Sequence, residues 1–278
     1  MIEGHWLVDA DTRYAVETKG PYPLGAPEYI VMHFTQMGSV KSSVDLLNSR
    51  GFGYHVLIDR DGTVHQMAPF DQMTWHAGTS NWRGRVKMND FCVGVSLANH
   101  GPLSKVDSHY EATFGARFER NEVTVASHYN GHPKALDIAW ERFPDAQVAA
   151  ALDVCRALAV AYPIRDVLRH DDIAVGRKLD TGPALDFAPF HALVDRSGER
   201  GELHRVMADG AEVRSTYSTR GRRLGRLAKG REVHVLSRAY TVRGTVSSFC
   251  NWCLVSEDGA TRLGFMRVRD LESIEPMV

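Results

Sequence analysis

The sequence has few cysteines, no long hydrophobic run and almost no net charge, and each of these features excludes a class of protein. Only 4 of the 278 residues are cysteine, too few for a disulfide framework in a chain of this length. The apolar runs are far shorter than the ~20 residues of a membrane-spanning helix. The formal net charge of -1 gives no general attraction to nucleic acid. What remains, 44% hydrophobic and 24% charged residues, is typical of a folded protein with a substantial core.

The N-terminus lacks a basic patch followed by an apolar stretch. Residues 1–6, MIEGHW, therefore do not indicate a secretory signal. We expect a protein that is cytoplasmic as synthesised and has no membrane span. It would reach a target outside the cell only through lysis or by another route that needs no signal.

Charge is distributed unevenly along the chain. Residues 1–195 carry 18 basic and 24 acidic side chains, whereas residues 196–278 carry 15 basic and 10 acidic ones. The change coincides with a polar, glycine-containing stretch that is typical of a linker. The sequence therefore predicts a first domain over 1–195, a linker over 196–203 and a second domain over 204–278.

The first part alternates between strand and helix patterns. Ser39 is placed to cap a helix, and apolar residues recur at helical spacing over residues 144–162. The predicted strands are residues 29–34, 54–59, 63–67 and 91–97, the second and third joined by an Asp61-Gly62 turn. This pattern predicts an α/β fold with a mixed central sheet flanked by helices. Residues 106–140 give no clear pattern, and we interpret them as an insertion loop.

The second part has a different pattern. Short β-rich runs cover residues 231–237, 240–246, 252–256 and 261–268, and glycines separate several of them. Short strands with glycine turns predict a small all-β barrel.

Three residues form a candidate zinc site. His33 ends the first buried strand, His170 follows a short strand, and Asp180 lies ten residues further on. Two imidazoles and one carboxylate leave a fourth tetrahedral position open for water, as in catalytic zinc sites. Spacing alone does not decide the matter, because a histidine at a strand end is more often structural. The CxxC pair of Cys250 and Cys253 is a weaker metal signal, since the other cysteines are distant.

Local motifs strengthen this hypothesis. Five segments, in order, resemble the zinc-dependent N-acetylmuramoyl-L-alanine amidases of the superfamily that includes AmpD, T7 lysozyme and the peptidoglycan recognition proteins. The matching segments are residues 29–35 (YIVMHFT), 53–64 (GYHVLIDRDGTV), 74–78 (TWHAG), 89–97 (NDFCVGVSL) and 170–183 (HDDIAVGRKLDTGP).

The resemblance implies a role for individual residues. His33, His170 and Asp180 match the zinc ligands of the family. Lys178 matches a lysine beside the metal, whose ammonium would polarise the scissile carbonyl and hold the developing oxyanion. The structural alternative for Lys178 is a solvated surface lysine.

One departure from the family concerns the proton-handling residue. AmpD-like members carry a glutamate where this sequence has Ser96, and a serine hydroxyl is a poor general base. The phage lysozyme branch also lacks that glutamate and uses a tyrosine in its GYH motif. Tyr54 takes that place here, although it could also be a core aromatic. We assign substrate binding to Trp75, His76 and Ser96, with a structural turn as the alternative for His76.

The C-terminal part resembles a bacterial SH3 (SH3b) domain. The similarity covers residues 211–215 (AEVRS), 224–236 (LGRLAKGREVHVL) and 264–268 (GFMRV). Such domains tether wall hydrolases to peptidoglycan, and an excess of basic residues suits an anionic wall polymer. The alternative is a packing domain whose charge is only solvated.

Together these observations predict a zinc amidase that cuts the bond between N-acetylmuramic acid and the L-alanine of a peptidoglycan stem peptide. The domain pairing favours a phage lysin or a delivered effector over a recycling enzyme. One alternative, motivated by Ser96, is a module that binds peptidoglycan with weak or no turnover. Another is a zinc hydrolase of a different amide, because substrate choice is determined by loops.

Overall fold

A computed structural model describes residues 1–278 apart from 131, 133–134, 197, 199, 244–245 and 275–278. Parts of the predicted insertion, of the predicted linker and of the β-rich run 240–246 lie outside the described residues. Among the described residues, no helix is long and apolar enough to cross a membrane.

The first part of the chain is built on a mixed five-stranded sheet, with strand order β14-β3-β8-β4-β5. β14, β3, β8 and β4 are parallel, and β5 pairs antiparallel with β4. The strands are β3 (Tyr29–Phe34), β4 (Val56–Ile58), β5 (Val64–Gln66), β8 (Cys92–Leu97) and β14 (Asp166–Arg169). The predicted mixed sheet and the hairpin at Asp61-Gly62 are thus confirmed.

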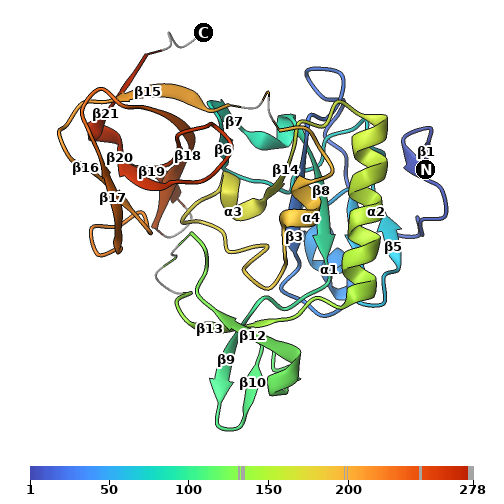
Figure 1. Cartoon of the computed structure of the whole chain (residues 1–278). Coiled ribbons are helices and arrows are strands. Elements are labelled where there is room, and N and C mark those ends of the chain that lie inside the picture. Colours follow the sequence, from blue (N-terminus) through green and yellow to red (C-terminus); the bar gives the residue numbers. More distant parts are fainter. Residues whose placement is uncertain (131, 133–134, 197, 199, 244–245, 275–278) are drawn as a thin grey trace.

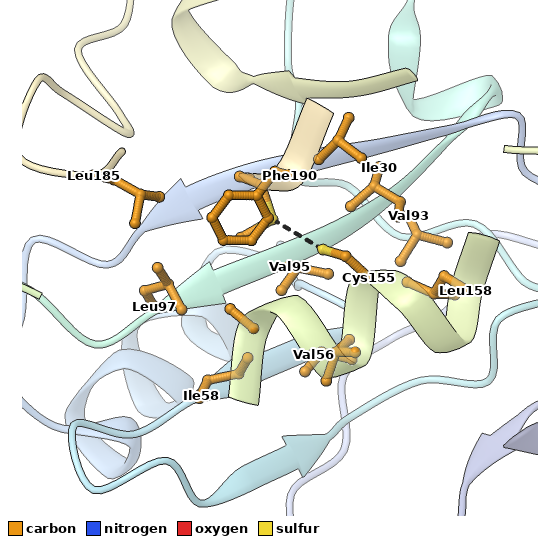
Figure 2. Packing of buried hydrophobic residues seen from close by; sticks show 14 of the residues in the cluster. Ile30, Val56, Ile58, Val93, Val95, Leu97, Cys155, Leu158, Leu185 and Phe190 are labelled. Atoms are coloured by element: carbon orange, nitrogen blue, oxygen red, sulfur yellow. Dashed lines mark hydrogen bonds between the residues drawn. The ribbon is translucent and has the colours of Figure 1, made fainter. Parts of the chain in front are cut away.

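Helix α2 (Asp145–Ala161) covers one face of this sheet (Figure 2). Successive side chains of a strand point to opposite faces, so Ile30 and Met32 of β3 face α2. The Cys155 thiol of α2 lies 3.6 Å from the Met32 sulfur. Short helix α4 (Ala188–His191) adds Phe190 to the same cluster. His33 therefore belongs to the opposite face, where the candidate site lies.

Helix α1 (Val40–Ser49) packs on that opposite face. Ser39 caps it as predicted, accepting a hydrogen bond from the backbone N–H of Ser42. Val40 and Val44 are buried against Leu57 of β4. The smaller elements are β1 (Ile2–Glu3), β2 (Trp6–Leu7), β6 (Asn81–Trp82), β7 (Arg85–Val86), α3 (His170–Ile173) and the 3-10 turns Met88–Asp90, Arg120–Glu122 and Val268–Asp270.

The expectation of an insertion loop at residues 106–140 was wrong, because five short strands between residues 102 and 141 form a second antiparallel sheet, with strand order β11-β10-β9-β13-β12. It projects below the central sheet in Figure 1. A separate cluster that includes Leu103, Tyr110 and Phe118 explains why it holds together. The strands are β9 (Pro102–Val106), β10 (His109–Glu111), β11 (Arg117–Phe118), β12 (Val123–Ala126) and β13 (Ile138–Glu141).

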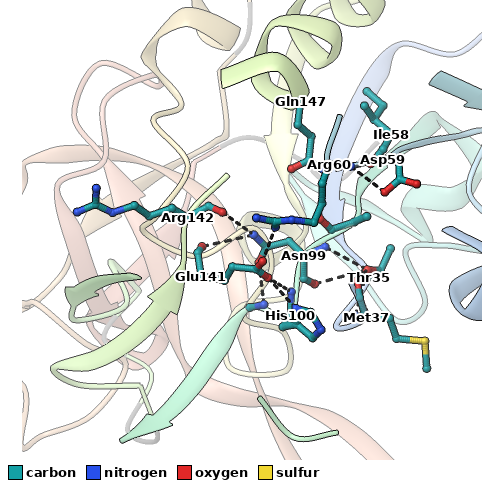
Figure 3. Close-up of polar contacts among 12 residues, drawn as sticks. Thr35, Met37, Ile58, Asp59, Arg60, Asn99, His100, Glu141, Arg142 and Gln147 are labelled. Carbon is teal, nitrogen blue, oxygen red and sulfur yellow. Dashed lines mark hydrogen bonds and ion pairs between the residues drawn. The ribbon is translucent and has the colours of Figure 1, made fainter. Parts of the chain in front are cut away.

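A polar network joins this second sheet to the central sheet (Figure 3). The Glu141 carboxylate at the end of β13 accepts from the backbone and ring nitrogens of His100 and pairs with Arg60. The Asn99 amide donates to the carbonyls of Glu141 and Arg142. The Asn99 backbone N–H in turn donates to the Thr35 hydroxyl, directly after β3. The inserted sheet is thus fixed to the strand that carries His33.

The C-terminal part forms a seven-stranded antiparallel sheet, with strand order β17-β16-β20-β19-β18-β15-β21. The expectation of short strands was wrong for β18 and β19, which have 12 and 11 residues and pair through two register shifts. The strands are β15 (Glu202–Val206), β16 (Ala211–Arg214), β17 (Arg223–Leu227), β18 (Glu232–Arg243), β19 (Val246–Ser256), β20 (Gly264–Arg267) and β21 (Leu271–Ser273).

The C-terminal sheet shares a hydrophobic core with the central sheet. Leu236 and Leu254 of the former are buried in one cluster with Val31 of β3. Backbone hydrogen bonds cross the same contact, from Arg83 N–H to the Leu236 carbonyl and from Tyr240 N–H to the Val175 carbonyl, at 2.7 and 2.8 Å. The two parts therefore stabilise each other.

Because the core is shared, we expect one cooperative thermal transition for the whole chain. Leu236→Ala should lower that transition as a unit, since truncating a buried leucine costs about 2–5 kcal/mol. Differential scanning calorimetry measures this directly. Val160→Ala is the matched control, because Val160 is 85% exposed on α2. Two separate transitions, with only one shifted by Leu236→Ala, would contradict the shared core.

Candidate functional site

Three buried side chains meet at the carboxyl ends of adjacent strands. His33 is near the end of β3, and His170 begins α3 directly after β14, which pairs in parallel with β3. The Nδ1 atoms of His33 and His170 are 2.9 Å apart, and they lie 3.0 and 2.8 Å from Oδ2 of Asp180. A 2.8 Å hydrogen bond from the Asp171 N–H to the Asp180 carbonyl holds the segment that carries Asp180 against α3.

The hydrogen bonds made by Nε2 of His33 and of His170 determine the tautomer of each ring, and therefore which ring nitrogen keeps a lone pair. His170 Nε2 lies 3.0 Å from the Ala77 carbonyl, which can only accept, so Nε2 carries the proton. His76 Nε2 likewise donates to the Cys92 carbonyl at 3.2 Å, which leaves His76 Nδ1 as an acceptor for His33 Nε2 at 3.0 Å. Both candidate ligand histidines therefore direct an Nδ1 lone pair at Asp180.

This arrangement fits a metal ion. Two nitrogen lone pairs and a carboxylate oxygen that face one another at hydrogen-bond distance repel unless a cation lies between them. Two imidazoles and one carboxylate are a typical catalytic zinc set. Among the described residues, these three form the group that could hold a metal, and the Cys250–Cys253 pair is not part of such a group.

The protonation states agree with metal binding. Burial lowers the pKa of His33, and it lowers the pKa of His170 to about 3, so both rings stay neutral. Burial alone would raise the pKa of Asp180, but the groups around it, the Lys178 ammonium among them, hold that pKa well below its usual value. Neutral imidazoles and an ionised carboxylate are the forms that bind a metal.

A cavity of about 340 Å³ opens beside this group, and Tyr54, Trp75, His170 and Lys178 are among its lining residues. The Tyr54 ring centre is 4.8 Å from that of His33. Burial, together with the nearby Asp180 carboxylate, raises the pKa of Tyr54, so its phenol stays protonated at neutral pH. Trp75 is 50% exposed at the cavity mouth, with the Lys19 ammonium 4.4 Å from its ring centre.

His76 and Ser96, to which the sequence assigned substrate binding, have different environments. Both ring nitrogens of His76 are taken up by His33 and the Cys92 carbonyl. A Cβ at position 94 would lie 2.6 Å from the His76 ring, so glycine is needed there. Ser96 is completely buried, in register with His33 on the neighbouring strand, where its hydroxyl faces Tyr54. Because His76 also lines the cavity, its role in substrate binding stays a prediction, whereas the complete burial of Ser96 is compatible with packing.

Sequence reasoning missed three residues that shape the site. The Asn89 side chain accepts from the backbone N–H groups of His76 and Ala77, which fixes the turn behind both histidines. Arg177 donates to the Ala77 carbonyl at 2.6 Å, and Arg50 is a further lining residue of the cavity. Asn89 and Arg177 lie within the quoted motifs, but spacing gave them no role.

The fold and site define a member of a known enzyme family. The N-acetylmuramoyl-L-alanine amidase family model matches residues 23–183, more than half of the chain. The chain therefore belongs to the N-acetylmuramoyl-L-alanine amidase family. The matched range includes all three candidate ligands.

Individual relatives are similar over the same region. The 1,6-anhydro-N-acetylmuramyl-L-alanine amidase AmpD of Escherichia coli K12 is 34% identical over 144 residues, 51% of this chain and 58% of AmpD. AmiD of the same organism, an N-acetylmuramoyl-L-alanine amidase, is 26% identical over 190 residues, 65% of this chain and 55% of AmiD. A crystal structure of a selenomethionine AmpD derivative covers 70% of this chain and 99% of its own, with a TM-score of 0.50 and 26% identity. The chain thus spans little more than half the length of these two curated relatives.

Buried neutral histidines generate a prediction about pH. His55 accepts from the Gly94 N–H through Nδ1 and donates to the Gln72 carbonyl through Nε2, so its neutral form fits and its cation does not. Burial lowers the pKa of His55 to about 4, and burial likewise lowers that of His191 to about 4. In the unfolded chain, both histidines take up a proton as the pH falls through ~6.5. In the folded chain they stay neutral at that pH, so the unfolded state binds more protons.

We therefore expect the metal-free protein to be fully stabilised by these groups above pH ~6.5 and to lose that stability as the pH falls toward ~4. A fully buried histidine such as His55 should contribute a loss of about 2 kcal/mol between pH ~7 and ~5. Urea unfolding in the presence of a chelator measures the loss as a lower midpoint at unchanged slope. A free energy of unfolding that stays constant over this range would contradict the neutral assignment.

Proposed function

We propose that this protein is a zinc-dependent amidase that hydrolyses the bond between N-acetylmuramic acid and the L-alanine of the stem peptide, releasing the peptide. The observation that carries the proposal is the convergence of His33, His170 and Asp180 beside a cavity lined by Tyr54 and Lys178. Membership of the amidase family supports the same chemistry.

The donor set supports zinc as the ion, held by His33 Nδ1, His170 Nδ1 and Asp180 Oδ2. Bound zinc would supply Lewis acidity and make a water nucleophilic at neutral pH. The relay through His76 keeps His33 in the tautomer that binding requires. Arg177 and His170 share the Ala77 carbonyl, which holds the second ring in place.

Lys178 and Tyr54 are the proposed catalytic residues of the cavity. The Lys178 ammonium polarises the scissile carbonyl and stabilises the negative charge that develops on its oxygen. The Tyr54 phenol remains protonated because its pKa is raised, so it acts as a hydrogen-bond donor that orients water or hands on a proton. In this scheme Tyr54 occupies the role that a glutamate plays elsewhere, and Ser96 packs behind it.

A peptidoglycan-binding module with weak or no turnover is the second candidate, and Ser96 is the observation that favours it. A pure binder has no need of three metal-binding atoms beside an open cavity, which supports the amidase. Measuring binding and turnover with the same muropeptide separates the two.

We predict that His33→Ala loses zinc and activity together, because the two remaining ligands cannot complete the site. Tyr54→Phe should retain zinc but lose about 10²–10³-fold in kcat, since it removes one polar group near the reacting carbonyl. Zinc content is measured by atomic absorption, and activity by release of L-alanyl peptides from purified muropeptides.

Two comparisons make this experiment decisive. Tyr110→Phe is the control for Tyr54→Phe, because it removes a phenolic hydroxyl in the inserted sheet, at a residue that does not line the cavity. A His33→Ala protein with full activity would refute the mechanism, whereas wild-type protein that binds the muropeptide without releasing peptide would favour the binding module.

For the C-terminal part we propose an SH3-like unit over residues 204–278 that binds anionic cell-wall polymer, joined through residues 196–203 to a catalytic unit over residues 1–195. The antiparallel sheet is compatible with this proposal, and the basic residues around its edge strand β17 support it. Residues 213–231, which include β17, contain 7 basic side chains and no acidic one. Such a pairing favours a wall-acting lysin or delivered effector over a recycling enzyme.

The exposed arginines of this edge give the test. Arg222→Ala combined with Arg226→Ala should weaken cosedimentation with purified cell walls several-fold, and the wild-type interaction should weaken with added salt. Arg156→Ala, on the exposed face of α2, is the matched control, and thermal unfolding verifies the fold of each variant. Wall binding that is indifferent to both salt and the double substitution would refute the electrostatic contact.

A further inference from the structure

The end of α1 contributes to the lining of the cavity. Leu46, Leu47, Arg50 and Phe52 all line the cavity there. The Arg50 and Phe52 N–H groups both bond to the Leu47 carbonyl at 3.0 Å, which stops the helix. The next residue, Gly53, donates to the Trp75 carbonyl at 3.2 Å. These backbone bonds fix the Arg50 end of α1 relative to the turn that carries His76.

The charged side chains that line the cavity are all positive. Three of its described lining residues, Arg50, Arg177 and Lys178, are cations, and none of the lining residues in the described part of the chain is an aspartate or glutamate. Asp45, the acidic residue of α1, pairs with Lys41 at 2.7 Å and is not a lining residue. A cavity of this kind attracts an anionic ligand.

The three cations differ in the hydrogen bonds and ion pairs that their side chains already make. Arg177 donates to the Ala77 carbonyl beside His170. Lys178 is the residue proposed to hold the oxyanion. Arg50 is exposed, and the described residues provide no ion-pair partner for its guanidinium. Its five donors are therefore available to a ligand, and a planar guanidinium matches a carboxylate through two parallel hydrogen bonds.

We propose that Arg50 is a specificity-determining residue that binds a carboxylate of the stem peptide, on the acidic residue that follows L-alanine. The cavity then selects peptides in which this carboxyl is free over peptides in which it is amidated. The proposal rests on the proposed function, since it assumes that the peptide side of the scissile bond extends toward α1. Exposed Phe52 and Trp75 flank this path and supply apolar contact to the peptide.

The test compares two soluble muropeptides that differ only by a carboxylate or a carboxamide on the residue after L-alanine. Wild-type protein should prefer the carboxylate by about 10-fold in kcat/KM, through KM, because one charged hydrogen-bonded pair is gained. Arg50→Ala should bring this ratio close to one. Arg50→Lys should give an intermediate ratio, because it keeps the charge but loses the paired geometry. Lys41→Ala, which removes a cation from the same helix outside the cavity, should keep the wild-type ratio.

A second readout keeps the two proposals separable. Binding of the same pair to chelator-treated protein, followed by tryptophan fluorescence, should show the same preference without turnover. If the protein binds the carboxylate peptide more tightly but cleaves neither, the amidase assignment fails and the Arg50 site stands. An equal affinity for both peptides, or a ratio unchanged in Arg50→Ala, overturns the Arg50 site whatever the activity.

Discussion

The site depends on two backbone carbonyls that no sequence motif encodes directly. The Cys92 carbonyl orients His76, which orients His33, and the Ala77 carbonyl orients His170. Because each carbonyl can only accept, every ring along these contacts has one allowed tautomer, and both inner lone pairs face Asp180. Burial adds to this effect, since it keeps the rings neutral. These contacts therefore arrange the three side chains in the form that a metal ion would need.

The sheet makes this geometry possible. β3 lies between β14 and β8, so one strand end carries His33, the next leads into His170, and the third lies under His76 at Gly94. One face of β3 packs on α2, and the other carries the site. Because side chains alternate along β3, one face of this strand belongs to the main core and the other to the candidate site.

Much of this organisation could be predicted from the sequence, for identifiable reasons. The β3 strand, the Asp61-Gly62 hairpin and the Ser39 cap each depend on local contacts, and the three candidate ligands stood out through a family motif. The inserted sheet could not be predicted, because its strands have only two to five residues and are organised by distant partners. The orientation of His76 also escaped prediction, since it depends on the absence of a side chain at position 94. The shared core of the two parts involves Leu236 and Val31, which are remote in the chain.

The hydrogen bond between Tyr240 and Val175 connects the C-terminal sheet to the candidate metal site. Val175 and Gly176 lie in the loop between His170 and Asp180, and an added Cβ at Gly176 would lie 2.6 Å from the Tyr240 carbonyl. The loop that carries Asp180 is thus held by contacts with β18 next to the candidate metal site. If a metal ion binds there as proposed, thermodynamic linkage means that its binding would protect the C-terminal sheet from local opening and from proteolysis, and that loosening this sheet would lower the affinity for the ion.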